Sequence, residues 1–356
     1  MRTLIRPTGF VDSPFGHDGK VARLAGGLNW FGLAELIRVE GNRRVGSEIV
    51  PVEELEKRFD EAMAADWTRI TGQRAPLRMG ERTVRLDQPQ VMGIVNATPD
   101  SFSDGGTYAD AAAAAEAGAG MAEQGAAIID VGGESTRPGA NAVWENDEID
   151  RVLPVVKQLA ASGHAVSIDT RKSGVMNAAL GGGAKLVNDV SALTWDPQSA
   201  TVVAQAGVPV VLMHHQGDPT TMQDAPRYDD ALVEVFLWLE DRISGAEAAG
   251  ITRDRILVDP GIGFGKSVAH NLELMNGLAL LHSLGCPIVL GASRKRMIGA
   301  LANEAPADRR LPGSLALALK AVEQGVQLVR AHDVPETVQA LKIWRGLRDS
   351  ALTPRI

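Results

Sequence analysis

Cysteine is nearly absent from this sequence, and so are the signals that would direct a protein into or across a membrane. Cys286 is the only cysteine among 356 residues, which excludes an internal disulfide and favours a reducing compartment. Its apolar neighbours, in CPIVLGAS, predict a buried strand residue rather than a reactive thiol. The opening MRTLIRPTGF lacks the apolar core of a signal peptide, and no apolar run reaches the roughly 20 residues of a membrane helix. We therefore expect a cytoplasmic protein with no membrane partner.

The sequence also has no surplus of positive charge. Its formal net charge is -8 and its pI is about 5.5, so no broad basic field is available to bind a nucleic acid or another polyanion. Any phosphate chemistry must depend on a local group of cations. Apolar residues make up 45% of the chain, which is enough to bury a large core. These properties favour a globular protein whose partner is a small molecule.

Residues 1–76 differ in character from the rest of the chain. Prolines and glycines between Pro7 and Gly19 predict an irregular opening. The first expected helix covers residues 51–67, with Pro51 at its entry and an apolar face formed by Leu55, Phe59, Ala62 and Met63. We interpret this segment as an α+β extension of unknown function that packs on the main domain.

Residues 77–356 repeat one pattern, in which an apolar strand is followed by a polar loop and a helix. The segment LRMGERTVRL comes first and is interpreted as a hairpin that closes the floor of a barrel. The expected strands are then 91–96, 126–131, 165–169, 185–188, 208–213, 255–259, 287–291 and 326–331. Such a series predicts an α/β domain of the (β/α)8, or TIM-barrel, class. A doubly wound open sheet is the alternative, but no GxGxxG motif follows the first strand.

Acidic and amide side chains stand where the expected strands end. Asp169, Asn188 and Asp259 follow apolar residues at the ends of three different strands. In a barrel the strand ends share one mouth, so we expect these side chains to converge there, partly shielded from water. They would bind a flat heterocycle that carries an amino group and ring N–H donors, while Lys295 could donate to its carbonyl. Alternatively, they cap loops and helices.

A second group of residues is mostly cationic and follows the second, seventh and eighth expected strands. Its members are Thr136, Arg137, Arg294, Lys295, Arg330 and His332. The loops after the last two strands of this barrel commonly bind phosphate, and an arginine offers a fork that matches phosphate oxygens. The group therefore predicts a phosphorylated or diphosphorylated ligand. The alternative is that these residues belong to solvated turns.

Two motifs resemble phosphate or metal sites but are interpreted otherwise. GIGFGK, at residues 261–266, lacks the glycine spacing of a Walker A loop, and we expect a tight loop that brings Phe264 over a ring. His214 and His215 are adjacent at a strand exit and point to opposite sides, which argues against joint metal binding. No HxH motif ends the first strand, and this disfavours a metal-dependent hydrolase.

Eight motifs, in this order, closely resemble the motif series of the dihydropteroate synthase family. They are VMGIVNATPDSFSDGG, IIDVGGESTRPGA, SIDTRK, LVNDVSAL, MHHQGDPTTMQ, DPGIGFGK, GASRK and RAHDV. The resemblance implies a transferase that joins 6-hydroxymethyl-7,8-dihydropterin diphosphate to 4-aminobenzoate, releasing 7,8-dihydropteroate and diphosphate with help from Mg²⁺. It also implies a sulfonamide-binding pocket and a homodimer formed through the later helices.

The same resemblance implies roles for individual residues. The pterin pocket would consist of Asp169, Asn188, Met213, Asp259, Phe264 and Lys295. The diphosphate would be bound by Asn96, Thr136, Arg330 and His332, with the metal at Asn96. The 4-aminobenzoate pocket would consist of Phe102, Arg137, Pro138, Ser293 and Lys295. Of these residues, the ones expected to act in catalysis are Asn96, Lys295, Arg330 and His332.

The sequence departs from the family pattern at positions that are not proposed ligands. Ala97 and Ala331 stand where valine is expected, and His215 stands where methionine is usual. Two other functions are compatible with a pterin pocket: a pterin-binding methyltransferase barrel, and a non-catalytic relative that uses the extension to contact a protein. The first would need neither the Arg and His residues of the rim nor the two long loops, and the intact residues of those loops disfavour the second.

Overall fold

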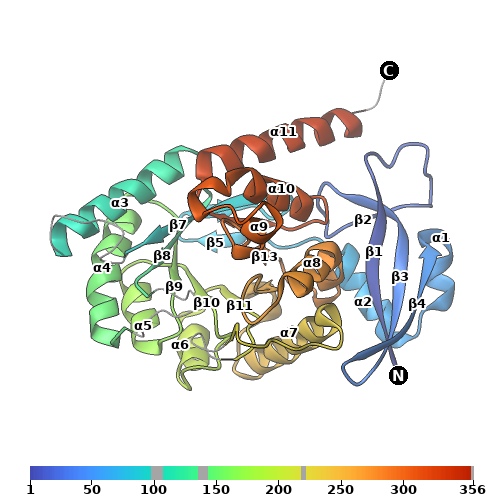
Figure 1. The fold of residues 1–356 in the computed structure, drawn as a ribbon, viewed down its shortest axis with the longest axis horizontal. Coiled ribbons are helices and arrows are strands. Elements are labelled where there is room, and N and C mark those ends of the chain that lie inside the picture. Colours follow the sequence, from blue (N-terminus) through green and yellow to red (C-terminus); the bar gives the residue numbers. More distant parts are fainter. Residues whose placement is uncertain (98–106, 135–142, 218–221, 354–356) are drawn as a thin grey trace.

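Eight parallel strands form the centre of the protein (Figure 1). The computed structural model describes residues 1–97, 107–134, 143–217 and 222–353. The strands are β7 (Gln90–Asn96), β8 (Ile128–Gly132), β9 (Val166–Asp169), β10 (Leu186–Asp189), β11 (Val210–Met213), β12 (Ile256–Asp259), β13 (Val289–Leu290) and β14 (Leu328–Ala331). Every predicted strand is present. Their residues are nearly all buried, as expected for strands covered on both faces.

The sheet closes into a barrel. Its strand order is β12-β11-β10-β9-β8-β7-β14-β13, and a parallel bridge between Val258 and Ile288 joins its two ends. The Val258 N–H also donates to Pro287 O at 2.9 Å. The predicted (β/α)8 class is therefore confirmed, and the open-sheet alternative is wrong.

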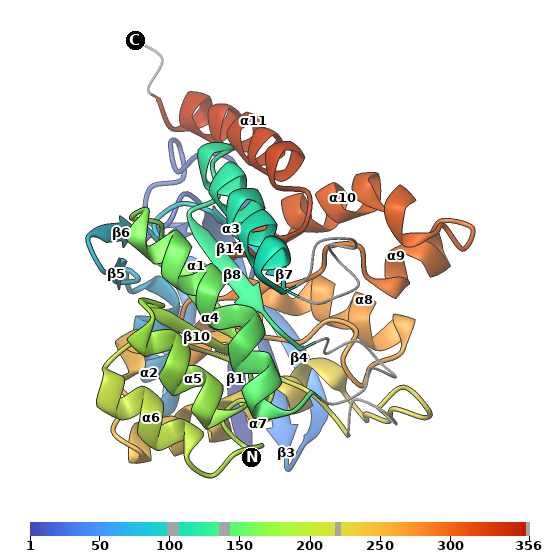
Figure 2. The same cartoon turned by 90° about the vertical axis from the view of Figure 1, so that its left-hand side faces the viewer.

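Helices surround the barrel and connect its strands. They are α3 (Thr107–Glu123), α4 (Glu145–Ala161), α5 (Ser173–Gly181), α6 (Ser199–Ala206), α7 (Ala231–Ala248), α8 (Val268–Gly277), α9 (Arg296–Leu301), α10 (Leu311–Val322) and α11 (Val334–Leu352). Figure 2 shows α3, α4, α5 and α6 side by side over one flank. The start of α7 is fixed because the Asp230 side chain accepts from Val233 N at 2.9 Å.

A hairpin covers the end of the barrel at which the strands begin. It consists of β5 (Leu77–Met79) and β6 (Arg82–Val84). Its apolar side chains, with Leu86, form one buried cluster with residues at the starts of the strands, including Met92, Ile128 and Leu186. The expected closure of the barrel floor is therefore confirmed.

The extension is a sheet backed by short helices, which the sequence interpretation described only in part. Its strands are β1 (Arg2–Val11), β2 (Ala22–Arg23), β3 (Trp30–Glu40) and β4 (Arg43–Pro51), followed by α1 (Val52–Leu55) and α2 (Glu61–Thr71). The predicted irregular opening is confirmed for residues 12–21, which include Pro14, Gly16 and Gly19, but it is wrong for Pro7 and Gly9, which lie inside β1. They are tolerated because β1 pairs only with β3 and is an edge strand.

The single helix predicted over residues 51–67 is also wrong. The backbone of Phe59 is extended, and the Asp60 side chain accepts from Met63 N at 2.8 Å to start α2. An N-cap residue in the middle of the pattern therefore divides it into two helices. Met63 and Leu55 still share one buried cluster with Phe31 of the sheet.

The extension and the barrel share a core rather than touching only through polar surfaces. Leu4, Ile37 and Val39 of the extension belong to the same buried cluster as the barrel helices. Arg2 forms a two-pronged ion pair with Glu240 of α7, at 2.5 and 2.7 Å. Among the described residues, no helix is both long and apolar enough to cross a membrane.

Candidate active site

Four side chains from four strands form one hydrogen-bonded network in the barrel mouth. Arg330 of β14 donates through Nε to Asp130 Oδ2 at 2.6 Å and through Nη2 to Asp169 Oδ2 at 2.7 Å. Asn188 of β10 donates to the same Asp130 oxygen at 2.9 Å. Each residue lies at or within three residues of the carboxyl end of a parallel strand, where the strands of a barrel bring their side chains together. The expected convergence of Asp169 and Asn188 is therefore observed, with Asp130 and Arg330 between them.

Asp259 faces the same mouth from β12. A Cβ atom placed on Gly291 would lie 3.6 Å from Asp259 Oδ2 and 4.0 Å from Arg330 Cδ, so these two side chains flank one glycine. Asp259 Oδ1 accepts from Gly261 N at 2.7 Å. Burial raises the pKa of Asp259, although this hydrogen bond and the nearby Lys295 act in the opposite direction.

The network is rich in buried acceptor oxygens. Asp130 Oδ1 and Asp169 Oδ1 are both buried and have no hydrogen-bond partner within the part of the chain that the structure describes. Burial raises the pKa of Asp169 to about 7, although Arg330 opposes the shift. Burial acts to lower the pKa of Arg330, but Asp130 and Asp169 together outweigh it and raise that pKa. A ligand with several N–H donors would complement such a site.

An aromatic ring and a lysine lie close to Asp259 in this mouth. Lys295 Nζ lies 4.0 Å from the centroid of the Phe264 ring, within the range of a cation–π interaction. Gly263 allows this approach, because a Cβ there would lie 3.3 Å from Lys295 Cδ. Met213 ends β11 in register with Asp259 and is buried. These side chains supply apolar walls and a cation to the same mouth.

The residues after β13 and β14 divide into two pairs. Ser293 Oγ and His332 Nδ1 share a hydrogen bond of 3.0 Å. Arg294, expected among the phosphate-binding cations, instead forms an ion pair with Asp333, with Nε 3.0 Å from Oδ2. Its backbone has a φ of 57°, and its N–H donates to Ser314 Oγ at 2.9 Å. We therefore interpret Arg294 as a residue that fixes this loop.

The remaining predicted residues follow the first two strands. Asn96 ends β7 with an exposed side chain. Phe102, Thr136, Arg137 and Pro138 lie outside the described residues.

Two functional candidates were missed by the sequence interpretation. Asp130 is fully buried in the network, and its signal was available, since an acid stands inside the apolar strand IIDVG. Lys266 is also buried, with Nζ 2.8 Å from His214 Nδ1. A lysine after a glycine-rich loop carries no sequence signal that separates it from a solvated lysine.

No metal centre built by protein side chains alone is visible in the described part of the chain. No group of three or more His, Cys, Asp or Glu residues there could hold an ion. The prediction that His214 and His215 point to opposite sides is wrong, because both rings lie against Trp238, with ring distances of 4.8 and 5.8 Å. His214 Nδ1 is instead engaged by Lys266.

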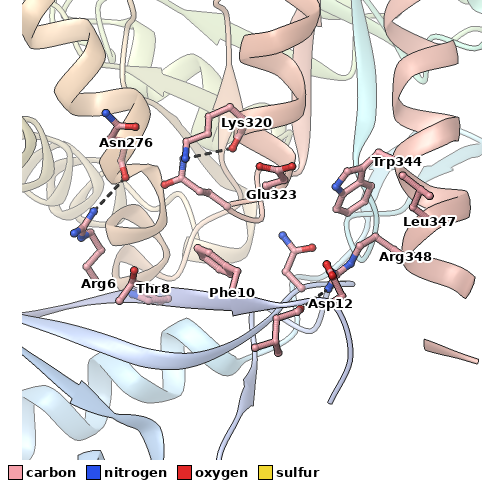
Figure 3. Close-up of a pocket in the computed structure, with 14 residues that line it drawn as sticks. Arg6, Thr8, Phe10, Asp12, Asn276, Lys320, Glu323, Trp344, Leu347 and Arg348 are labelled. Atoms are coloured by element: carbon pink, nitrogen blue, oxygen red, sulfur yellow. Dashed lines mark hydrogen bonds and ion pairs between the residues drawn. The ribbon is translucent and has the colours of Figure 1, made fainter. Parts of the chain in front are cut away.

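A cavity of about 400 Å³ lies between the extension and the barrel, away from the strand ends (Figure 3). Its walls include Arg6 and Phe10 of β1, Lys320 of α10 and Trp344 of α11. Its polar groups serve the seam between the two parts of the protein; Arg6, for example, donates to Asn276 O at 3.1 Å. The cavity is not part of the site in the barrel mouth.

Comparison with known proteins identifies the relatives of this chain. Residues 92–332 match the pterin binding enzyme family. The dihydropteroate synthase of Escherichia coli K12 is 47% identical over 259 residues, covering 72% of this chain and 91% of the relative.

Solved structures agree with this. That of Xanthomonas albilineans dihydropteroate synthase with 4-aminobenzoic acid is 48% identical, with a TM-score of 0.73, covering 77% of this chain and 98% of that one. A Yersinia pestis dihydropteroate synthase in a sulfonamide drug complex is 44% identical, with a TM-score of 0.73, covering 77% and 100%. Nearly a quarter of this chain therefore has no counterpart in either structure.

Proposed function

The chain belongs to the dihydropteroate synthase family of pterin-binding enzymes, and from this membership we infer that its barrel mouth joins 6-hydroxymethyl-7,8-dihydropterin diphosphate to 4-aminobenzoate. The products are 7,8-dihydropteroate and diphosphate, so the protein is a transferase. The observation that carries this function is the buried network of Asp130, Asp169 and Asn188, in which Asp130 Oδ1 and Asp169 Oδ1 have no hydrogen-bond partner among the described residues and need N–H donors. The amino group and ring N–H groups of a pterin are such donors.

We assign the pterin to the depth of the mouth. Asp169, Asn188 and Asp259 would accept from its N–H groups, and Lys295 would donate to its carbonyl. Met213 and Phe264 would form the apolar walls. The position of Lys295 supports this assignment. Its ammonium group lies over the Phe264 ring and close to Asp259, so it could reach a pterin held between them.

The diphosphate and 4-aminobenzoate are assigned to the outer part of the mouth. Asn96, Thr136, Arg330 and His332 would bind the diphosphate. Phe102, Arg137, Pro138, Ser293 and Lys295 would bind 4-aminobenzoate. Ser293 is assigned to 4-aminobenzoate and His332 to the diphosphate. The hydrogen bond between these two side chains supports neighbouring positions for the two ligands.

Magnesium is proposed to arrive with the diphosphate. The only ligand that this chain is proposed to offer it is the amide oxygen of Asn96, an exposed oxygen at a strand end. That donor fits a hard cation whose other ligands are substrate oxygens and water. When bound, Mg²⁺ would supply positive charge to the leaving diphosphate.

We propose that diphosphate leaves before the amine attacks. The carbon–oxygen bond breaks with its electron pair moving to the diphosphate, and the electron-rich dihydropterin ring stabilises the methylene cation that remains. The neutral amine of 4-aminobenzoate then forms the carbon–nitrogen bond, and its proton passes to the released diphosphate or to water. The amine needs orientation and a water-poor pocket rather than a general base.

Further proposals concern inhibitors, assembly and location. The sulfonamide complex of the Yersinia pestis relative supports sulfonamide binding in the 4-aminobenzoate pocket. A homodimer through the later helices is supported by Ile343 and Leu347 of α11, which are 65% and 68% exposed. A reducing, cytoplasmic location is supported by the single buried thiol of Cys286.

Diphosphate release tests the proposed function. The protein is mixed with the pterin diphosphate and Mg²⁺, with and without 4-aminobenzoate, and free diphosphate is measured. Release that depends on 4-aminobenzoate and yields dihydropteroate supports the synthase. Tight pterin binding without such release would instead favour a non-catalytic pterin-binding protein.

A further inference from the structure

The loop between β12 and α8 carries a buried lysine that the proposed reaction does not use. Lys266 is 3% exposed, and its Nζ lies 2.8 Å from His214 Nδ1, 2.9 Å from Gly261 O and 3.0 Å from Phe264 O. An ammonium group has three N–H donors. Three close acceptors from two chain segments therefore match its full donor capacity.

The neutral form of His214 agrees with this geometry, whereas the lowered pKa of Lys266 opposes it. Burial lowers the pKa of His214 well below its usual value, so the ring is neutral and Nδ1 can accept when the proton is on Nε2. Burial also lowers the pKa of Lys266, and Asp259 opposes that shift. A neutral amine would present only two N–H donors to three acceptors, so the contacts favour the ammonium form.

Three backbone N–H groups of the loop donate inside the protein, so they do not point at a bound phosphate. Gly261 N donates to Asp259 Oδ1 at 2.7 Å, Gly263 N to Asn271 Oδ1 at 2.8 Å, and Phe264 N to Gly261 O at 3.1 Å. Its last carbonyl is also bound, since Tyr228 donates to Gly265 O at 2.9 Å. The interpretation of GIGFGK as a tight structural loop agrees with these contacts.

The loop lies directly on the end of β11. Gly261 and Gly265 have φ angles of 66° and 63°. A Cβ on Gly261 would lie 1.8 Å from His214 O, and one on Gly265 would lie 2.4 Å from Gln216 O. The glycines permit this close backbone contact but do not hold it, because they contribute no side chain. The bonds of Lys266 to Gly261 O and Phe264 O gather the loop around its Nζ, and the bond to His214 Nδ1 attaches the loop to the other segment.

We propose that Lys266 is a positioning residue of the reaction, which fastens the loop 261–265 to β11 and so holds the Phe264 ring beneath Lys295 in the pterin pocket. This inference rests on the proposed function of the mouth. Lys266 acts through Phe264, whose carbonyl it binds and whose ring contacts Lys295. It belongs to neither of the substrate pockets proposed above.

A double-mutant cycle tests the inference. Lys266→Met should raise the KM for the pterin diphosphate about tenfold and change the KM for 4-aminobenzoate less than about twofold. In the Phe264→Leu background, Lys266→Met should raise the KM for the pterin diphosphate by less than about twofold more, because the ring that Lys266 positions is gone. If the two effects multiply in full, Lys266 does not act through Phe264 and the inference is overturned.

Arg74→Met is the matched control. Arg74 is likewise a buried cation, and it donates to the backbone carbonyls of Arg69, Gly72 and His282, away from the mouth. It should lower the melting temperature while the KM for the pterin stays within about twofold of the parent value. A pterin KM raised equally in both variants would show that loss of stability, rather than positioning, explains the effect.

A measurement on the unaltered protein covers the case in which Lys266→Met fails to fold. Nitrogen-15 NMR of the histidine rings, with His214→Gln to assign the signal, should show an unprotonated Nδ1 and a protonated Nε2 at neutral pH. A protonated Nδ1 would exclude donation from Lys266 and overturn the inference. Because this experiment uses no substrate, its failure is distinguishable from failure of the proposed reaction, which would appear as an inactive parent enzyme.

Discussion

The raised pKa of Asp169 predicts that pterin binding depends on pH. In the free enzyme this carboxyl has a pKa of about 7, because burial favours its neutral form. The charged groups that face it are Arg330, which opposes the shift, and Asp130, Glu148 and Asp189, which add to it. A pterin brings N–H donors, which bind the ionised carboxylate better than the neutral acid. Binding should therefore release a proton, and affinity should increase as pH rises toward 7.

The expected magnitude follows from the fraction of Asp169 that is ionised. Each pH unit below the pKa weakens the free energy of pterin binding by about 1.4 kcal/mol, which is roughly tenfold in affinity. Between pH 5.5 and 8 the affinity should therefore rise about thirtyfold and level off above pH 7. The native state binds this proton more tightly than the unfolded chain, so the same shift lowers the free energy of unfolding as pH rises from about 4 to 7.

Calorimetric titration with 6-hydroxymethylpterin measures this effect without turnover. Repeating it in two buffers of different ionisation enthalpy counts the protons released. The isosteric Asp169→Asn variant is the control, and it should bind more weakly and release about one proton fewer below pH 7. An affinity that is flat from pH 5.5 to 8 in the parent protein would refute the reasoning, and so would an unchanged slope in the variant.

Four further predictions concern single changes. Lys295→Ala should lower turnover by about a hundredfold or more, because it removes the cation over the ring; near-normal kinetics would contradict the assignment. Asp259→Ala should raise the pterin dissociation constant at least about tenfold, measured by the same calorimetry. Arg330→Met should lower the free energy of unfolding by about 3–5 kcal/mol, because the buried Asp130 carboxylate loses its cation; an unchanged urea midpoint would contradict this. Deleting residues 1–76 should also lower that midpoint, because it exposes the shared core.

The barrel could be predicted from the sequence because its signals are local and redundant. Each buried strand is a short apolar run, and the same strand–loop–helix unit recurs through residues 77–356. One weak signal does not change such a prediction. β13, for example, is only two residues long, yet the strands on either side of its position specify it. A fold built from repeated units therefore tolerates local errors of interpretation.

The extension was harder to predict because its strands contain residues that usually end strands. Pro7 and Gly9 suggested a loop, but β1 pairs along most of its length with β3, as in the register of Ile5 with Leu36. That partner lies some thirty residues away in the sequence, so its contribution is not a local property. Propensity describes a residue in isolation, whereas an edge strand is stabilised by its neighbour.

The candidate site was predictable in position but not in its internal contacts. The strand-end rule placed Asp169, Asn188 and Asp259 in one mouth, as the structure does. It could not show that Asp130 lies between Asn188 and Arg330, because that requires side-chain directions. Nor could it separate Arg330 from Arg294, since both follow late strands, although one binds buried carboxylates and the other binds Asp333.

The contacts of Arg330 also bear on how the pterin and diphosphate sites are connected. A guanidinium group is planar and offers donors along two edges. The edge that includes Nε and Nη2 is used on Asp130 and Asp169, so only the edge between the two Nη groups can serve phosphate oxygens. If Arg330 binds diphosphate as proposed, it does so while fixed by the acids that face the pterin. A change at Asp130 would then weaken diphosphate binding as well as pterin binding, although Asp130 itself is too deeply buried to reach the outer part of the mouth.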